Sequence, residues 1–292
     1  MARSAGSGRE AHGSQTRTGE RLVTTIRCAV EYDGTAFCGF QFQPELRTVA
    51  GTLETALSRL FDEPVKITGA GRTDTGVHAT GQVVSCKTAR AFPFDKLAIA
   101  LNSILPADIS VREAAVVSDP FSARFSARER TYVYAILNQP DRSALLARRA
   151  HHVYAALDLE RMRDAARHLI GEHDFRSFCG VLPESGGTVR ILKSLDIERR
   201  GPYVRVSISA DGFLHRMVRT IVGTLVECGK GRRDPQSIAA VLDARAREAA
   251  GVTAPARGLY LAGVKYADGY DSFREPPLFA GDASISASNL SN

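Results

Sequence analysis

The densest group of polar residues in the chain lies at residues 69–78, with the sequence GAGRTDTGVH. Asp74 is its only carboxylate, Arg72 precedes it by two residues and His78 follows it by four. A cation beside an Asp favours the ionised form, which is the form that acts as a nucleophile or base. The glycines allow tight turns and close approach of a ligand. One interpretation is therefore a carboxylate held ready for chemistry beside Arg72 and His78, which are both candidates for binding the substrate.

Residue types alone leave a second interpretation of this segment open. An Asp in a loop most often bonds its own backbone in a turn. A dinucleotide-binding motif is excluded, because Asp74 stands where its third glycine would fall and a strand is expected to follow. A P-loop is excluded because the chain has no Gly-Lys-Ser or Gly-Lys-Thr.

The charge balance suits a polyanionic partner. The 292 residues carry a formal net charge of +6, and the pI is about 9.2. Each phosphate that a basic protein neutralises releases counterions, which favours binding to nucleic acid. Only six of the 38 basic residues are Lys. Because GC-rich genomes favour Arg codons, charge alone leaves nucleic-acid binding open.

Cysteine usage and hydropathy limit the class of protein. The five cysteines are odd in number and widely spaced, which predicts neither a disulfide framework nor a zinc site. The chain has no run of about 18 apolar residues, so no membrane span is expected. Residues 1–20 lack the apolar region of a secretory signal. We therefore expect a cytoplasmic protein.

Periodicity predicts the same order of elements twice. Strand, helix, strand, strand, helix and strand are expected at residues 26–32, 52–61, 65–69, 81–88, 94–104 and 109–117. The order recurs at residues 131–137, 159–170, 191–198, 203–209, 215–228 and 259–266. Asp158 is expected to cap the helix at 159–170, and an extra helix is expected to follow Asp234 as N-cap and Pro235.

This order predicts an α+β fold of two ferredoxin-like β-α-β-β-α-β units, with antiparallel sheets and helices on one face. The active-site cleft is expected between the halves. Residues 22–120 are expected to form the N-terminal domain, which carries the Asp74 loop, and residues 121–270 the C-terminal domain. Residues 1–21 and 271–292 are expected to be disordered tails.

Residues 71–79, GRTDTGVHA, closely resemble the G-R-T-D-A-G-V-H-A/G signature of the TruA-type tRNA pseudouridine synthases and differ from it at Thr75. Further motifs that resemble the family follow in its order: EYDG at 31–34, FSARERTYVY at 125–134, HDFRSF at 173–178, FLHRMVR at 213–219 and GLYL at 258–261. The resemblance covers nearly the whole chain between the two tails.

The resemblance implies an enzyme that detaches uracil from the ribose, rotates it and rejoins it through carbon, at positions 38, 39 and 40 of the tRNA anticodon stem-loop. It implies Asp74 as the nucleophile, Arg219 as the partner of that carboxylate, and Tyr132 stacked on the target uracil. Arg72 is expected to contact the RNA backbone, and Leu259 to pack beneath the uracil ring. The family works as a homodimer, with tRNA spanning both subunits. No redox change occurs, so no cofactor and no metal are expected.

The chain departs from the family pattern at three positions. Phe42 stands where an Arg is usual, which predicts the loss of one phosphate contact. Arg216 stands where a second His is common, and Thr220 where an Asn is common. None of these changes falls on Asp74 or Arg219.

Several alternatives stay open at this stage. Without the family, Tyr132 would be a core or edge-strand aromatic, Arg219 a solvated helix residue and Leu259 a core residue. The repeated FSAR at 121–124 and 125–128 suits either a basic loop facing RNA or a surface turn. An RNA-binding protein without activity would explain fold and charge, but not the RTD cluster. A metal-dependent phosphoryl transferase would need more clustered carboxylates than the chain has.

Overall fold

The computed structural model describes residues 23–185, 187–267 and 269–280. The strands are β1 Thr24–Tyr32, β2 Ile67–Gly69, β3 His78–Thr88, β4 Ile109–Val117, β5 Ala127–Leu137, β6 His151–His152, β7 Gly171–Asp174, β8 Val189–Arg200, β9 Tyr203–Ala210 and β10 Leu259–Tyr266. The α-helices are α1 Val49–Phe61, α2 Leu97–Asn102, α3 Leu159–Arg167, α4 Met217–Gly229 and α5 Ser237–Ala244. Short 3-10 turns lie at Gly34–Ala36, Phe94–Lys96, Phe175–Phe178, Arg247–Ala249 and Ala256–Gly258.

A single sheet runs through the molecule in the order β4-β1-β3-β10-β5-β9-β8-β7, with β2 paired to β3 and β6 to β5. The first half has the order β4-β1-β3-β2 and the second half the order β10-β5-β9-β8, each with antiparallel neighbours. This is the ferredoxin-like order in both halves, so the predicted α+β fold is confirmed. The two expected sheets are joined into one, because β10 pairs with β3 in parallel at Tyr260–His78 and Leu261–Ala79.

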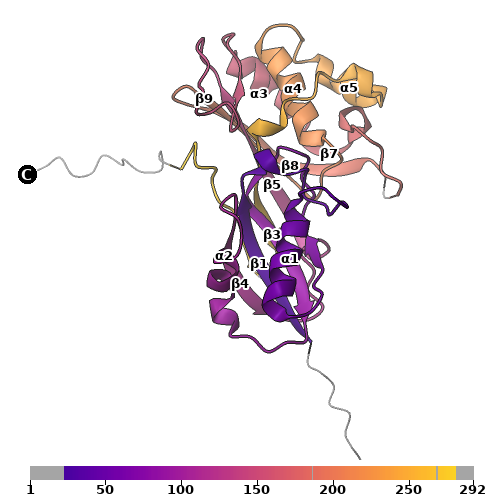
Figure 1. The fold of residues 1–292 in the computed structure, drawn as a ribbon. Helices are drawn as coiled ribbons and strands as arrows, with labels where there is room; N and C mark the ends of the chain where they lie inside the picture. Colours follow the sequence, from indigo (N-terminus) through magenta and orange to yellow (C-terminus); the bar gives the residue numbers. More distant parts are fainter. Residues whose placement is uncertain (1–22, 186, 268, 281–292) are drawn as a thin grey trace, which may run out of the picture.

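The helices bury apolar faces against this sheet. In α1, Leu53, Leu57 and Phe61 are buried, and Thr48 caps the start of the helix, because its side chain accepts a hydrogen bond from the Gly51 backbone N–H. In α4, 11 of the 13 residues are buried, as expected for a helix that is apolar on all sides. Figure 1 shows α1 across the strands of the first half and α3, α4 and α5 gathered over the second half.

Most predicted elements are found, with shifted ends. Asp158 caps α3 as predicted, by accepting hydrogen bonds from two backbone N–H groups. The predicted helix at 94–104 is an α-helix only at Leu97–Asn102, after a 3-10 turn. The N-cap of α5 is Gln236, so the expectation for Asp234 is wrong by two residues. Strands β6 and β7 were not predicted, because they are short and lack apolar alternation.

The expected tail at 271–292 is wrong for residues 271–280, which pack on the sheet. Phe279 is buried, and Glu275 forms an ion pair with Arg205 of β9. The Ser272 hydroxyl donates to the Gly81 carbonyl of β3 at 2.8 Å. The tail expected at residues 1–21, and the rest of the C-terminal one, lie outside the described residues.

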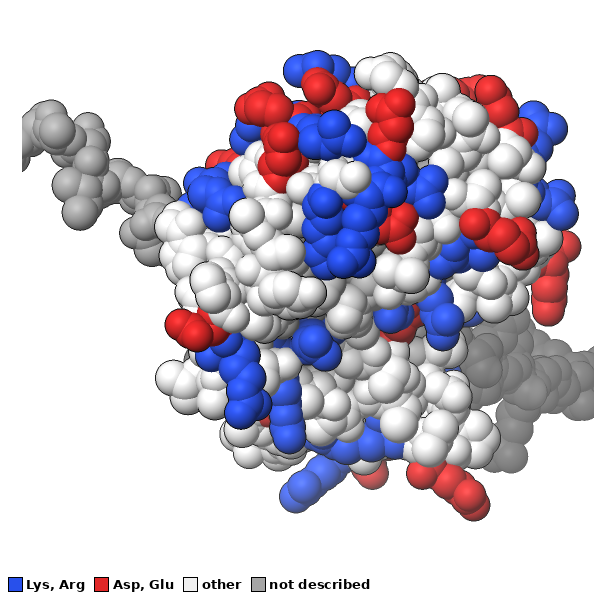
Figure 2. Space-filling view, turned by 90° about the horizontal axis from the view of Figure 1, so that it is seen from above, with Lys and Arg blue, Asp and Glu red and all other residues white. Residues whose placement is uncertain are grey.

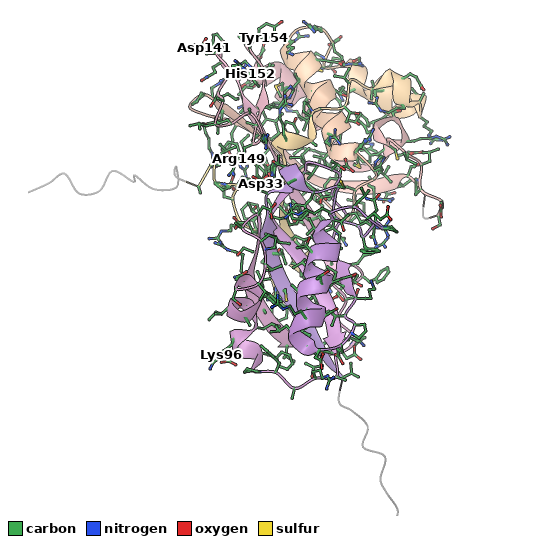
Figure 3. All side chains as sticks on the ribbon, in the orientation of Figure 1. Asp33, Lys96, Asp141, Arg149, His152 and Tyr154 are labelled. Atoms are coloured by element: carbon green, nitrogen blue, oxygen red, sulfur yellow. The ribbon has the colours of Figure 1, made fainter. Side chains whose placement is uncertain are left out.

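Contacts between the halves extend beyond the sheet. Arg149 in the second half pairs with Asp33 in the first, with 3.1 Å between nitrogen and carboxylate oxygen, and the two side chains meet at the junction in Figure 3. One apolar cluster contains buried residues from both halves. The division at residue 120 into two separate domains stays a prediction. On the face seen from above, Lys and Arg gather in the middle, with Asp and Glu mainly toward the edges (Figure 2).

Candidate active site

The loop that carries Asp74 comprises residues 70–77, between β2 and β3. Hydrogen bonds between uncharged groups hold it in place. The amide of the buried Gln82 donates to the Gly71 carbonyl at 2.7 Å. The Tyr32 and Thr73 hydroxyls are 2.8 Å apart. Burial raises the pKa of Tyr32 to about 12, so its hydroxyl stays neutral. These contacts fix the backbone on both sides of Arg72, and therefore the approach to Asp74.

The backbone of a neighbouring segment fixes the same loop from its other side. The Phe40 N–H donates to the Thr73 carbonyl at 3.0 Å. Gly39, just before it, has a φ of +84°, and a Cβ there would lie 3.0 Å from the same carbonyl oxygen. Glycine is favoured at this position, because the positive φ strains other residues and a Cβ would crowd the Thr73 carbonyl.

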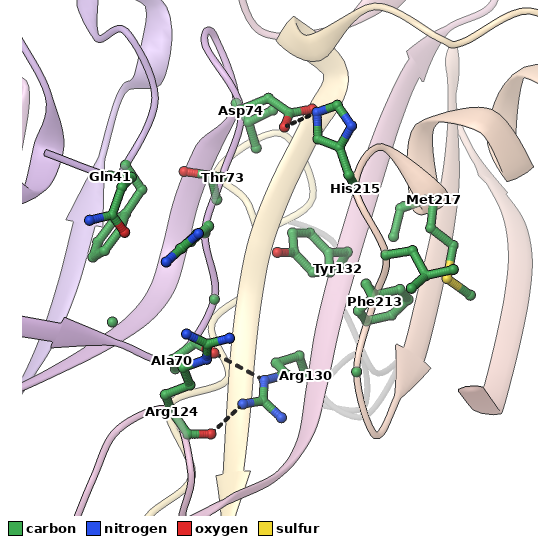
Figure 4. A pocket seen from close by; sticks show the side chains of 18 of the residues that line it. Gln41, Ala70, Thr73, Asp74, Arg124, Arg130, Tyr132, Phe213, His215 and Met217 are labelled. Carbon is green, nitrogen blue, oxygen red and sulfur yellow. Dashed lines mark hydrogen bonds and ion pairs between the residues drawn. The ribbon is translucent and has the colours of Figure 1, made fainter. Parts of the chain in front are cut away.

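The carboxylate of Asp74 faces two basic side chains from the second half. The Arg219 guanidinium of α4 donates to Oδ2 at 2.7 Å and is held in turn by the Ala254 carbonyl, to which its Nε donates at 2.8 Å. His215 Nε2 lies 3.7 Å from Oδ1 (Figure 4). The side chains of Asp74 and Arg219 are 27% and 15% exposed, so the pair is largely removed from water. The pairing orients the carboxylate and leaves Oδ1 the less tightly bound oxygen.

A cavity of about 680 Å³ opens above this carboxylate, between the two halves as predicted. Its walls include Tyr132 of β5, Leu259 at the start of β10, and Phe213. The Tyr132 ring meets Phe213 edge-on, with 5.1 Å between centroids, and lies between the Asp74 loop and Phe213 in Figure 4. Burial raises the pKa of the Tyr132 phenol, which keeps it protonated. The volume lies in the range of small-molecule sites, and the lining places aromatic and apolar side chains beside a single carboxylate.

Cationic side chains surround the mouth of the cavity. Arg72, Arg124 and Arg216 are exposed and Arg190 is half-buried, and all four line the cavity. None forms an ion pair with a carboxylate in the part of the chain that the structure describes. Guanidinium groups without carboxylate partners are available to phosphate oxygens of a ligand.

His78 does not line the cavity, and the expectation that it contacts the substrate beside Asp74 is wrong. Its ring is buried, its Nδ1 accepts from the Gly34 N–H at 3.1 Å and lies 3.2 Å from Asp33, and its Nε2 is 2.9 Å from the Arg148 carbonyl. The ring also stacks on Tyr260 at 4.7 Å. His78 begins β3, where alternation turns its side chain away from the Asp74 loop. It ties the two halves together instead.

The site shows no place for a metal among the described residues: no group of three or more His, Cys, Asp or Glu could hold an ion. Within the same residues, no helix has the length and apolarity needed to cross a membrane.

The residues of this site lie in a chain that matches a known protein family. The sequence model of a family described as "tRNA pseudouridine synthase" matches residues 28–126 and 165–267. The chain belongs to the tRNA pseudouridine synthase family. Asp74 lies in the first matched stretch and Arg219 in the second, whereas Tyr132 lies between them.

Curated relatives of this synthase family are similar over most of the chain, and those named here are called tRNA pseudouridine synthase A. The protein of Brevibacillus brevis is 45% identical over 82% of this chain and 99% of its own length. The protein of Halalkalibacterium halodurans is 47% identical over 80% and 89%. The protein of Salmonella paratyphi B is 45% identical over 89% and 97%.

The structure adds residues to the synthase site that the sequence analysis did not single out. His215 and Phe213 belong to the FLHRMVR motif, whose polar and aromatic residues ahead of an apolar helix were the available signal. Arg130 belongs to the FSARERTYVY motif, but its partners could not be read from it, because they are backbone carbonyls of Ala70, Arg124, Ala127 and Asp211, which only the fold brings together.

Proposed function

We propose that this chain converts uridines at positions 38, 39 and 40 of the tRNA anticodon stem-loop into pseudouridine, with Asp74 as the nucleophile. Its family makes it an isomerase that acts on uridine in tRNA. The observation that supports the role of Asp74 is the 2.7 Å ion pair with Arg219, which orients the carboxylate in a cavity lined by Tyr132 and Leu259. Both partners stand at the positions that the family motifs assign to this pair.

The reaction needs one carboxylate and no net change in composition. The N1–C1′ bond breaks, the uracil turns, and a C5–C1′ bond forms. C5 loses its proton and N1 gains one, so product and substrate are isomers. Asp74 acts on C1′ of the ribose, on C6 of the base, or on the 2′ proton, all of which belong to the same nucleotide.

The other lining residues hold the extruded nucleotide in this proposal. Tyr132 stacks on the uracil, and its neutral hydroxyl is available for proton transfer. Leu259 supports the opposite side of the ring, and Arg219 keeps the carboxylate oriented. Arg72 contacts the RNA backbone, which its exposure and its free guanidinium support.

We further propose that the protein works as a homodimer in the cytoplasm. The dimer rests on the family resemblance, and sedimentation of the purified chain at several concentrations tests it. All five cysteines are free, which suits a reducing compartment.

The test is incubation of the purified chain with unmodified transcribed tRNA, without added metal, followed by site-resolved detection of pseudouridine. We expect product at positions 38–40 and none in a tRNA with cytidine at those positions. Binding of tRNA without any pseudouridine would favour the RNA-binding alternative. Product elsewhere in the tRNA would refute the site assignment and leave the activity standing.

Affinity for tRNA offers a second measurement. Because the cavity mouth gathers several cations, binding should weaken steeply as salt rises. Four phosphate contacts would give a slope of log affinity against log salt of about −3 to −4. An affinity that is flat between low and physiological salt would contradict an RNA substrate.

A further inference from the structure

Phe125 is an exposed aromatic side chain at the edge of the cavity. It is 81% exposed although it is a large apolar residue, and it lines the cavity together with Arg124. The Arg124 guanidinium lies 5.4 Å from the centre of the Phe125 ring. The guanidinium lies over one face of the ring, so the other face is available to a nucleobase, and a phenyl face reads no hydrogen-bonding groups of the base.

The turn that presents Phe125 is rigidly built. The Ser126 N–H donates to the Ser122 carbonyl at 2.9 Å, and the Ser122 N–H donates to the Ser126 hydroxyl at 3.1 Å. The Ala123 N–H donates to the Ser85 hydroxyl at 3.0 Å, and the Ala123 carbonyl accepts from Tyr266 at 2.8 Å. The exposure of Phe125 is therefore fixed by its surroundings, and little ordering of this turn is needed on binding.

The preceding FSAR repeat shows what a structural Phe does in this segment. Phe121 is 9% exposed and packs on Tyr266, with ring centroids 5.1 Å apart. Phe125 is followed by the same three residues, but among the described residues its ring packs on no other aromatic ring, and only the Arg124 guanidinium lies over it. The two repeats therefore separate into an anchor, Phe121, and a ring left open to a ligand.

Arg130 connects this turn to the Asp74 loop. Its guanidinium donates to the Ala70 carbonyl at 3.1 Å and to the Arg124 carbonyl at 2.6 Å, as Figure 4 shows. Phe125 and Asp74 line the same cavity. A base that meets Phe125 therefore belongs to the same bound stretch of RNA as the target uridine.

We propose that Phe125, backed by Arg124, stacks on an unpaired base of tRNA that neighbours the target uridine and so positions the uridine over Asp74. This inference rests on the proposed function. Extrusion of the target breaks stacking on its neighbours, and a protein ring at the cavity edge replaces part of it. Because a phenyl ring stacks on every base, the contact positions the RNA without restricting its sequence.

The experiment compares four variants for pseudouridine formation on unmodified tRNA. Phe125→Ala and Phe125→Leu should lower kcat/KM about 5- to 100-fold, the range that loss of one stacked base gives, whereas Phe125→Tyr should stay within about twofold. Tyr154→Ala removes another exposed aromatic, which does not line the cavity and lies at the far end of the second half (Figure 3), and should be neutral. Because Phe125 is exposed, all four should fold as the wild type does.

A spectroscopic readout separates stacking from apolar contact. We would bind an anticodon stem-loop RNA with 2-aminopurine beside the target uridine, and compare fluorescence on wild type and Phe125→Leu. Stacking predicts a quenched signal on wild type and a brighter one on the variant. Equal fluorescence, or a Leu variant as active as the Tyr variant, would overturn the proposal. An inactive wild type would refute the proposed function instead.

Discussion

The two halves of the chain share a strand order but differ in their connections between the second and third strands. In the first half this connection is the eight-residue loop at 70–77, which carries Asp74. In the second half it is Gly201-Pro202, a two-residue turn between β8 and β9. A turn of that length has no room for a presented carboxylate, so the scaffold alone does not make a site.

The connection between the third strand and the second helix is specialised in the second half of the chain. Between β9 and α4, residues 211–216 provide Phe213 and His215 and lead into Arg219. The equivalent stretch of the first half, residues 89–96, does not line the cavity. Each half thus contributes one modified connection, and the parallel pairing of β3 with β10 brings the two together. The difference teaches that the repeated unit supplies rigid strands, while the chemistry lies in segments that break the repeat.

The largest effect should come from the specialised loop. Asp74→Asn removes the charge of the carboxylate but no cation, so pseudouridine formation should fall more than about a hundredfold. Affinity for tRNA should stay within a few-fold, because the change touches no phosphate contact. Asp196→Asn, on the exposed face of β8 in the other half, is the matched control and should be as active as wild type. Turnover of Asp74→Asn above a hundredth of wild type would remove Asp74 from the nucleophile role.

The partner from the other half should give the next largest effect. Arg219→Lys keeps the charge but loses the planar fork that joins the Asp74 carboxylate to the Ala254 carbonyl. Breaking a fully buried pair costs about 3–5 kcal/mol, and a misfit Lys in this partly exposed pair should cost less. We expect kcat to fall about 10- to 100-fold in a single-turnover assay.

The exposed Arg167 of α3 is the control for this substitution, and Arg167→Lys should leave kcat unchanged. Normal turnover of Arg219→Lys, or a defect confined to tRNA binding, would separate Arg219 from the catalytic pair.

The sequence predicted the repeated elements well, because their apolar periodicity is local. Strand β10 was predicted with both ends correct, and Asp158 with its capping role. The joining of the two halves by β10 and β3 was not predictable, since only two residue pairs make it and strand pairing depends on distant segments. The packing of residues 271–280 on the sheet was not predicted, because the segment is rich in proline and polar residues and shows no apolar periodicity around the buried Phe279.

The site was predicted in part, for a similar reason. Asp74, Arg219, Tyr132, Arg72 and Leu259 all line the cavity, and their motifs identified them. His78 belongs to the same motif but begins a strand, so its side chain points to the opposite face. The support of the site by Gln82 and Arg130 could not be foreseen, because both act on backbone carbonyls that are distant in the chain.

A smaller effect is expected from the support beneath the Asp74 loop. Gln82→Leu replaces a buried amide and removes the hydrogen bond that it donates to the carbonyl of the half-buried Gly71. The free energy of unfolding should fall by about 1–3 kcal/mol, measured by urea denaturation. Activity should fall in the remaining folded protein, because the loop loses its anchor. Gln236→Leu, at the exposed start of α5, should change neither quantity, and equal stability of both variants would show that the loop does not depend on Gln82.

The smallest predicted effect concerns two histidines, one in each half of the chain, which differ in their hydrogen-bond partners. His78 in the first half has partners for both ring nitrogens, whereas His151 in the second half has a buried Nδ1 without a hydrogen-bond partner in the described structure. Burial, followed by the charge of Arg257, lowers the pKa of His151 to about 4. Below pH 6.5 the unfolded chain therefore takes up a proton that the folded chain does not, until the pH reaches about 4.

The free energy of unfolding should consequently decrease as the pH falls from 6.5 to 4, and His151 should account for about 2 kcal/mol of the loss at pH 5. His151→Phe keeps a ring against Tyr134 and removes the titrating group. We would measure urea unfolding of both proteins at pH 7.5 and pH 5, so that carboxylates common to both cancel. The variant should gain about 2 kcal/mol on the wild type between the two pH values. If the stabilities of the two proteins changed equally with pH, His151 would be protonated to the same extent in the folded and unfolded chains. The contrast with the fully hydrogen-bonded His78 would then be refuted.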